Sequence, residues 1–111
     1  MISDLLEFFE ACKLHLENLK IRSIRCSYTL NEEYVEHFIG LLKHCWKDVV
    51  DVKVEIQQID ILQMFLQEIV HTKVLKIKLN TSLEDKDIND IVTEFRIKYF
   101  DRTLEVNHMT D

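Results

Sequence analysis

The sequence predicts an α/β domain with one helix followed by alternating strands and helices, in the order α-β-α-β-α-β-α-β. Short segments with apolar residues at every second position alternate with longer segments whose apolar residues recur at helical spacing. The remaining positions of the strand-like segments are largely charged, whereas strands buried on both faces are apolar throughout. We therefore expect helices on one face of the sheet only, in a curved repeat arc or a two-layer sandwich.

Size and composition fit a single folded domain over residues 1–111, alone or as part of a larger repeat protein. The chain is 47% hydrophobic and 31% charged, and its formal net charge of −6 argues against a dedicated nucleic-acid binder. No apolar run reaches the ~20 residues that span a bilayer, so no membrane partner is expected. An odd number of cysteines in apolar segments predicts reduced thiols in the cytoplasm or nucleus; they are Cys12, Cys26 and Cys45.

The N-terminal part is predicted to contain the first helix and the first strand. Residues 3–15 have apolar residues at helical spacing, with Ser3 as the N-cap. Residues 16–29 alternate like a strand, but the phase slips at 23–24, where we expect a β-bulge. The predicted inward residues are Leu19 and Ile21 before the slip, and Ile24, Cys26 and Tyr28 after it.

The rest of the chain continues the alternation. Asn31 is the expected N-cap of a buried helix, and Thr81 or Ser82 that of the last helix. The helices are predicted over 31–46, 60–71 and 81–100, and the strands over 48–58, 73–80 and 102–106. The strands align in steps of 33, 23 and 29 residues, which indicates a degenerate repeat with equivalent inward residues Leu19, Val52, Leu75 and Leu104.

Several strand segments resemble the L-x-x-L-x-L strand portion of leucine-rich repeats: Leu16-x-x-Leu19-x-Ile21, Val49-x-x-Val52-x-Val54 and Leu75-x-Ile77-x-Leu79. The Asn or Cys that usually follows this strand is missing. Over residues 14–107 the chain is similar to the repeat-like substrate-binding regions of F-box proteins, particularly the divergent nematode ones, although it contains no F-box. The resemblance implies a receptor surface for a protein partner, with a link to ubiquitin ligation through a segment outside this chain.

Residues of the common enzyme classes occur without the spacing that their chemistry needs. The single glycine, Gly40, lies in a helical pattern, so phosphate-binding loops and dinucleotide motifs are absent. His44 and Cys45 point about 100° apart on a helix and cannot form a nucleophile–base pair. Cys12 and His15 share a helical face but lack the second ligand pair of a zinc site. The remaining acidic cluster fits a solvated helix start better than a cation site; it comprises Glu84, Asp85, Asp87 and Asp90.

The outward residues of the predicted strands form the candidate binding site, because they lie side by side on the open face. Exposed sheet faces of repeat proteins commonly bind other proteins. The candidate residues are Lys20, Arg22, Asp51, Lys53, Glu55, Lys76, Lys78 and Glu105, followed by Asn107. The alternatives are a plain solvated face and, for the basic members, a nucleic-acid contact, which the lack of outward aromatic residues disfavours.

We therefore expect a protein–protein interaction module without catalytic activity and without a cofactor. Its partner is another protein or a second copy of the chain. The last strand has no covering helix after it, so its edge is open to further pairing. The alternative is a small subunit of a larger assembly, or a homo-oligomer, that buries this edge and the helices. A small enzyme with a site assembled from distant His, Glu and Cys residues is a third hypothesis.

Overall fold

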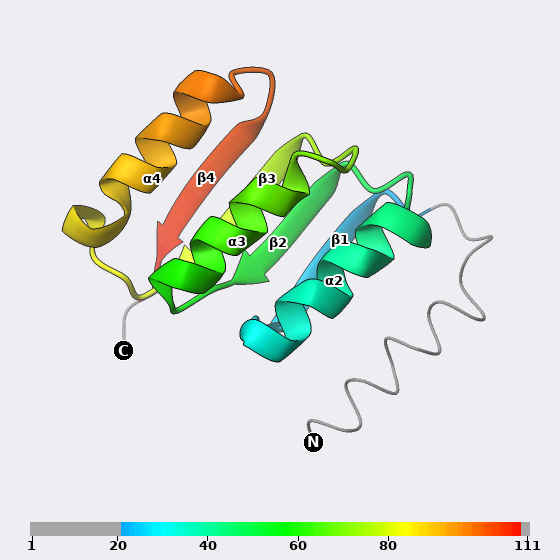
Figure 1. The fold of residues 1–111 in the computed structure, drawn as a ribbon, viewed down its shortest axis with the longest axis horizontal. Coiled ribbons are helices and arrows are strands. Elements are labelled where there is room, and N and C mark those ends of the chain that lie inside the picture. Colours follow the sequence, from blue (N-terminus) through cyan, green and yellow to red (C-terminus); the bar gives the residue numbers. More distant parts are fainter. Residues whose placement is uncertain (1–20, 110–111) are drawn as a thin grey trace.

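Four parallel strands form one sheet, and their order in the sheet is their order along the chain (Figure 1). The fold is known from a computed structural model, which describes residues 21–109. With the labels of Figure 1, its elements are β1 (Ser23–Thr29), α2 (Glu32–His44), β2 (Asp51–Glu55), α3 (Ile59–Ile69), β3 (Lys76–Thr81), α4 (Asp85–Lys98) and β4 (Thr103–His108). The helix predicted over 3–15 lies outside the described residues.

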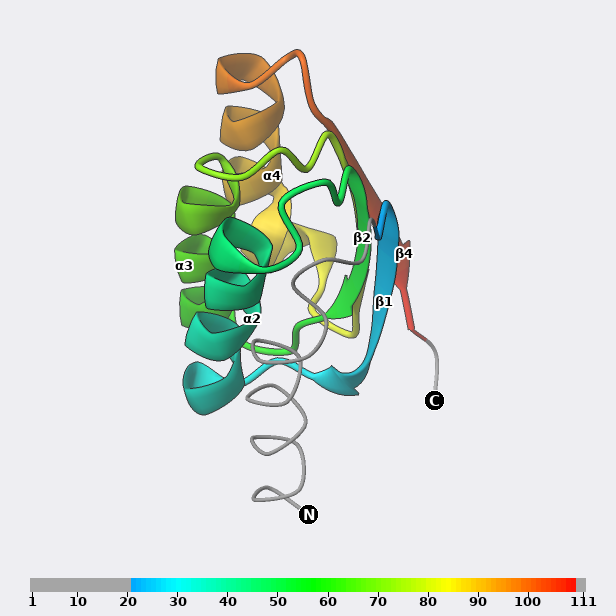
Figure 2. The ribbon, with the colours of Figure 1, turned by 90° about the vertical axis from the view of Figure 1, so that its right-hand side faces the viewer.

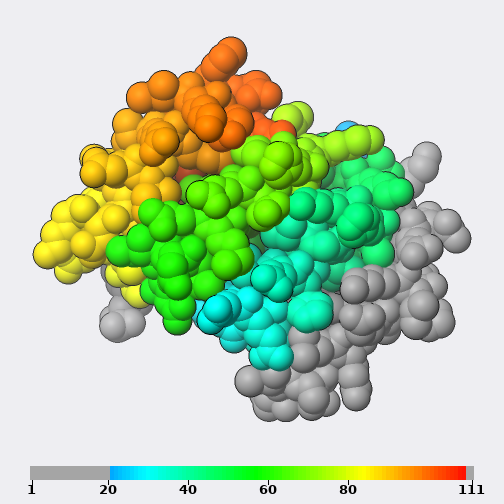
Figure 3. Space-filling view, viewed as in Figure 1, coloured from blue at the N-terminus to red at the C-terminus, as the bar shows by residue number. Residues whose placement is uncertain are grey.

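The helices α2, α3 and α4 all lie on one side of the sheet, as Figure 2 shows in an edge-on view. Figure 3 shows how they cover that side, one beside the next. Within residues 21–109 no helix covers the other side. The expectation of a two-layer α/β fold with helices on one face is thus confirmed for the described part of the chain.

The strands repeat more regularly than the sequence indicated. Parallel pairing places Ile24, Val52, Ile77 and Leu104 side by side. From residue 24 to 52, from 52 to 77 and from 77 to 104, the steps are 28, 25 and 27 residues. The predicted equivalence of Leu75 was therefore wrong by two residues, and Leu19 lies outside the described residues.

Two residues that were expected to face the core are exposed. Leu75 precedes β3 and is 50% exposed, while its neighbour Val74 is fully buried in its place. Tyr28 is 55% exposed, because the register between β1 and β2 shifts between Arg25 and Thr29. The bulge expected at 23–24 is therefore located later in the strand.

The hydrophobic core lies between the sheet and the helices. Alternate residues of the strands supply one side of it, and the apolar stripes of the helices supply the other. Phe38 links α2 to α3, since its ring centroid lies 6.3 Å from that of Phe65 in α3 and 6.4 Å from that of Trp46, which follows α2. Residues with at most 1% exposure include Val35, Phe38, Leu41, Val52, Val54, Ile61, Leu62, Phe65, Ile77, Leu79 and Ile88.

The helix ends agree with the sequence at α2 and differ at α4. Asn31 caps α2, because its Oδ1 accepts hydrogen bonds from the backbone N–H of Glu33 and Tyr34 at 3.0 and 2.9 Å. Neither Thr81 nor Ser82 caps α4, whose N-cap position is Glu84. Thr81 is the last residue of β3 and is buried there, so it cannot also begin the helix.

The C-terminus of α3 is closed by an arginine from a distant loop. Arg102, just before β4, donates from Nη1 to the carbonyl oxygens of Val74 at 2.6 Å and Ile69 at 3.1 Å. Its Nη2 donates to the carbonyl oxygens of Val70 at 2.8 Å and Thr72 at 3.2 Å. The last carbonyls of a helix lack partners within the helix, and a cation there also matches the helix dipole. Arg102 therefore ties the start of β4 to the end of α3 and to the loop before β3.

Candidate partner-binding face

The open face of the sheet is polar because every second residue of each strand points away from the helices. In β2, the buried Val52 and Val54 alternate with Asp51, Lys53 and Glu55. The same alternation in β3 directs Lys76, Lys78 and Asn80 outward, and in β4 it directs Thr103, Glu105 and Asn107 outward. We call these residues, together with Ser23 and Arg25 of β1, the open face.

The central row of the open face runs across all four strands. Arg25 pairs with Lys53, Lys53 with Lys78, and Lys78 with Glu105 in the parallel register. Neighbouring strands lie about 4.8 Å apart, so the row places three cations side by side and ends on one carboxylate. None of the ion pairs within residues 21–109 includes a residue of this row. The row is thus a line of three cations, of which only Lys78 has a carboxylate, that of Glu105, as its neighbour in the row.

The rows on either side have different charge patterns. On one side, Asp51 of β2 pairs with Lys76 of β3, so opposite charges are neighbours there. On the other side, Glu55 is next to Asn80 and accepts a hydrogen bond from the hydroxyl group of Thr29. The positive charge is therefore concentrated in the central row.

Six of the eight predicted site residues lie together on the open face: Asp51, Lys53, Glu55, Lys76, Lys78 and Glu105. Arg22 is exposed but precedes β1, where its carbonyl oxygen accepts hydrogen bonds from the backbone N–H of Val50 at 2.8 Å and Asp51 at 3.2 Å. Arg22 therefore does not belong to the row, and Lys20 lies outside the described residues.

Arg25 is the functional candidate that the sequence-based selection missed. It occupies the position in β1 that had been given to Lys20 and Arg22. The signal was present in the sequence, because Arg25 alternates with the partly buried Ile24 and Cys26. The prediction took the outward residues of the first strand from positions 20 and 22, whereas the described strand begins at Ser23.

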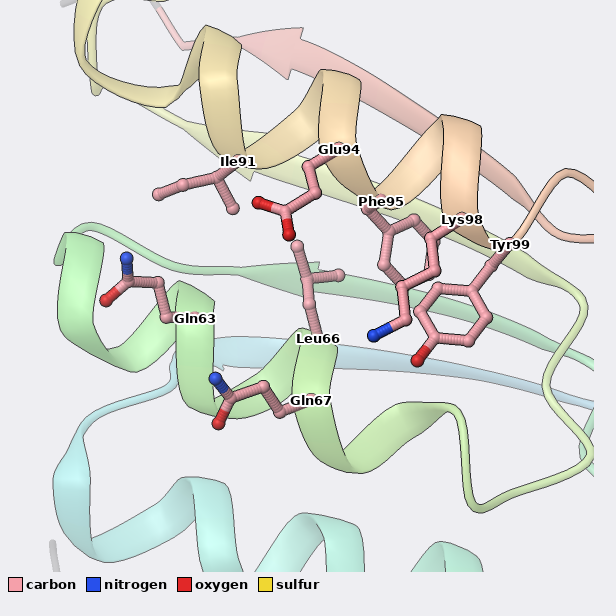
Figure 4. A pocket seen from close by; sticks show the side chains of 8 residues that line it. All are labelled: Gln63, Leu66, Gln67, Ile91, Glu94, Phe95, Lys98 and Tyr99. Atoms are coloured by element: carbon pink, nitrogen blue, oxygen red, sulfur yellow. The ribbon is translucent and has the colours of Figure 1, made fainter.

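A second surface feature is a groove between α3 and α4 on the helical layer (Figure 4). It measures about 200 Å³, less than the ~300–1,000 Å³ of typical small-molecule sites. Apolar side chains of Leu66, Ile91 and Phe95 meet polar ones of Gln67 and Glu94 around it. A groove of this volume is too small to enclose a typical small-molecule ligand.

The other chemistry-bearing residues have local roles. Burial raises the pKa of Cys26, which keeps it a thiol and a poor nucleophile. In the acidic cluster, Asp85 pairs with His108 at 2.7 Å and Glu84 with Lys86 at 3.2 Å. Within residues 21–109 no group of three or more His, Cys, Asp or Glu side chains is arranged to hold a metal ion. Cys12 and His15 lie outside that range.

Two further observations concern the described part of the chain as a whole. None of its helices has both the length and the apolar character needed to cross a bilayer. Among residues 21–109 no disulfide forms, and Cys26 and Cys45 are thiols.

No protein-family model, no curated protein and no solved structure matches the chain.

Proposed function

We propose that this chain is a non-enzymatic protein-binding module that contacts its partner through the open face. The observation that supports this most strongly is the central row, in which Arg25, Lys53 and Lys78 are direct neighbours. Like charges opposite each other in a sheet are destabilising. Sequences tolerate such local conflicts mainly at functional sites. A partner that supplies carboxylates to the row would remove the repulsion on binding.

The repeating architecture supports the same function. The chain resembles leucine-rich repeats in its strand segments, and extended sheet faces of stacked repeats are common protein-binding surfaces. By that resemblance, the open face corresponds to the substrate-binding side of the repeat-like regions in F-box proteins. The thiols of Cys26 and Cys45 support a reducing compartment, the cytoplasm or the nucleus, as the site of action.

The function can be tested by affinity capture from the source cell. The wild-type chain is compared with the double variant Lys53→Glu/Lys76→Glu by quantitative mass spectrometry. A matched control is Lys73→Glu/Lys86→Glu, which has the same change in charge but alters the loop before β3 and helix α4. We expect a protein that the wild type and the control capture and the open-face variant loses.

Retention of the same partner by all three proteins would contradict the proposal, provided that circular dichroism shows each to be folded. Loss of the partner from the control alone would place the interface on the helical layer.

A second candidate function is a subunit that assembles through the β4 edge. Within residues 21–109 β4 has a neighbour only on the β3 side, and two large apolar side chains near its start are exposed, Ile97 by 73% and Phe100 by 88%. Arg96 donates two hydrogen bonds to the carbonyl oxygen of Leu104 in β4, so this carbonyl already has its donors, and the exposed side chains of Ile97 and Phe100 would add apolar contact. Analytical ultracentrifugation of the purified chain, without any captured partner, tests self-assembly. A chain that remains monomeric at high concentration contradicts it.

A further inference from the structure

The two layers of the fold differ in charge. The open face has four cations, Arg25, Lys53, Lys76 and Lys78, and three anions, Asp51, Glu55 and Glu105, a balance of +1. Helices α2, α3 and α4 contain nine Asp and Glu against four Lys and Arg, a balance of −5. Of the two layers, the sheet therefore offers the more favourable surface to a short acidic segment. A nucleic acid, with a charge at every phosphate, is repelled by the net charge of −6.

The central row also specifies a direction and a spacing. Read from β1 to β4, Arg25, Lys53, Lys78 and Glu105 give three positive charges and then one negative charge. Three steps between strands cover about 14 Å. A complementary segment thus presents three carboxylates and then one cation over about the same length, and it lies across the strands.

The spacing favours a helix over an extended segment. Helical residues i, i+3, i+7 and i+10 share one face and extend over about 15 Å, at a rise of ~1.5 Å per residue. Four residues on one face of an extended segment cover about 20 Å, at ~3.3 Å per residue. The helix therefore differs from the row by about 1 Å, which long Arg and Lys side chains can absorb, while the extended segment differs by about 6 Å.

From this match we infer that the open face binds an acidic α-helix of the partner protein, which lies across the strands. Its carboxylates contact Arg25, Lys53 and Lys78, and a basic residue one turn further contacts Glu105. This inference rests on the proposed function and specifies the chemistry of its partner.

The probe is a synthetic helical peptide of about 18 residues, rich in Ala, with Glu at i, i+3 and i+7 and Lys at i+10. The ¹⁵N-labelled chain is titrated with it at low ionic strength, and amide chemical shifts report both affinity and location. We expect saturable shifts at strand residues around Lys53 and Lys78, with affinity that falls as salt rises. A peptide of equal composition, with its charges scrambled around the helix, should bind at least about threefold more weakly.

Charge exchange then tests the contact itself. Lys53→Glu should weaken the binding of the acidic helical peptide by at least about threefold. Replacing the Glu at i+3 of the peptide by Lys should restore binding to the Lys53→Glu chain and weaken binding to the wild type. Lys73→Glu, with the same charge change off the open face, should bind like the wild type. Retained dispersion of the amide spectrum shows that each variant is folded.

Equal binding of the ordered and scrambled helices, tighter binding of an extended Glu-alternating peptide, or shifts confined to α2–α4 would each overturn the acidic helix as occupant. Saturable binding of a single-stranded oligonucleotide to the same strands, without peptide binding, would overturn it as well. If the helical peptide does not bind but cellular capture still depends on Lys53 and Lys76, the acidic helix is overturned and the proposed function is retained. Failure of both would remove the proposed function too.

Discussion

Lys53 of β2 and Lys78 of β3 occupy directly opposite positions in the parallel register, with Arg25 on the far side of Lys53. A carboxylate at position 53 would lie between two cations at about 4.8 Å, while Asp51 and Glu55 on its own strand are about 6.6 Å away. We therefore expect Lys53→Glu to raise the free energy of unfolding by about 0.2–1 kcal/mol. Urea denaturation at low ionic strength measures the gain, which should shrink as salt is added.

Lys76→Glu is the matched control for that experiment. It has the same change in charge and lies on the same face, but the neighbour of Lys76 in β2 is Asp51. The variant places two carboxylates opposite each other, so the free energy of unfolding should fall. Changes of equal sign at positions 53 and 76 would show that the charge row does not determine the stability of the open face.

Arg102 should be the most important surface arginine for stability. Arg102→Met keeps an apolar stem but removes the donors to four carbonyl oxygens at the end of α3 and in the loop before β3. We expect a loss of about 2–3 kcal/mol in the free energy of unfolding, because partly buried carbonyls lose charged donors. Arg96→Met, which frees only the carbonyl of Leu104, should lose about 1 kcal/mol. Denaturant titrations that rank the two variants in the opposite order would contradict the role of Arg102.

Gly40 is a site where stability can be gained. It lies inside α2 with φ in the ordinary helical range, and a Cβ added there meets no atom within 4 Å. Gly40→Ala should raise the free energy of unfolding by about 0.5–1 kcal/mol, since alanine loses less backbone freedom on folding. A melting temperature a few degrees higher is expected; a lower one would show a constraint at this position.

The Lys43–Glu68 ion pair should make a small contribution that depends on pH. The hydrogen bond from Lys43 at 2.8 Å, and then its charge, lower the pKa of Glu68. A carboxyl group with a lowered folded-state pKa stabilises the fold above its unfolded pKa and loses that effect as the pH falls through the folded value. Glu68→Gln should therefore be less stable than the wild type at neutral pH and equal to it in acid. A difference that stays constant across this range in denaturation curves would exclude the pair as its cause.

Local patterns in the sequence predicted the layers of the fold because each strand alternates by itself. The charges at every second position of β2 and β3 indicated an open face, and six of the eight chosen residues lie on it. Asn31 was identified as a cap because the capping hydrogen bond is made within three residues. Short-range interactions of this kind can be inferred from neighbouring residues alone.

Non-local pairing determined what the sequence could not predict. Val74 and Leu75 are adjacent and both apolar, and the fold buries Val74 and exposes Leu75. The local alternation already directs Arg25 outward, but only the pairing of β1 with β2 from Ser23 onward places it beside Lys53. Arg102 bonds to carbonyl groups about 30 residues earlier in the chain, a contact that no local pattern indicates.

Site-specific photo-crosslinking in the source cell tests most directly whether the partner binds to the open face. A photoreactive phenylalanine is placed at Asn80 or Thr103 on the open face, and at Gln63 or Thr93 on the helical layer as exposed controls. We predict crosslinks to one partner protein from the open-face positions and none from the helical ones, with loss of the crosslink in Lys53→Glu/Lys76→Glu. Crosslinks only from the helical positions would contradict the proposed binding face.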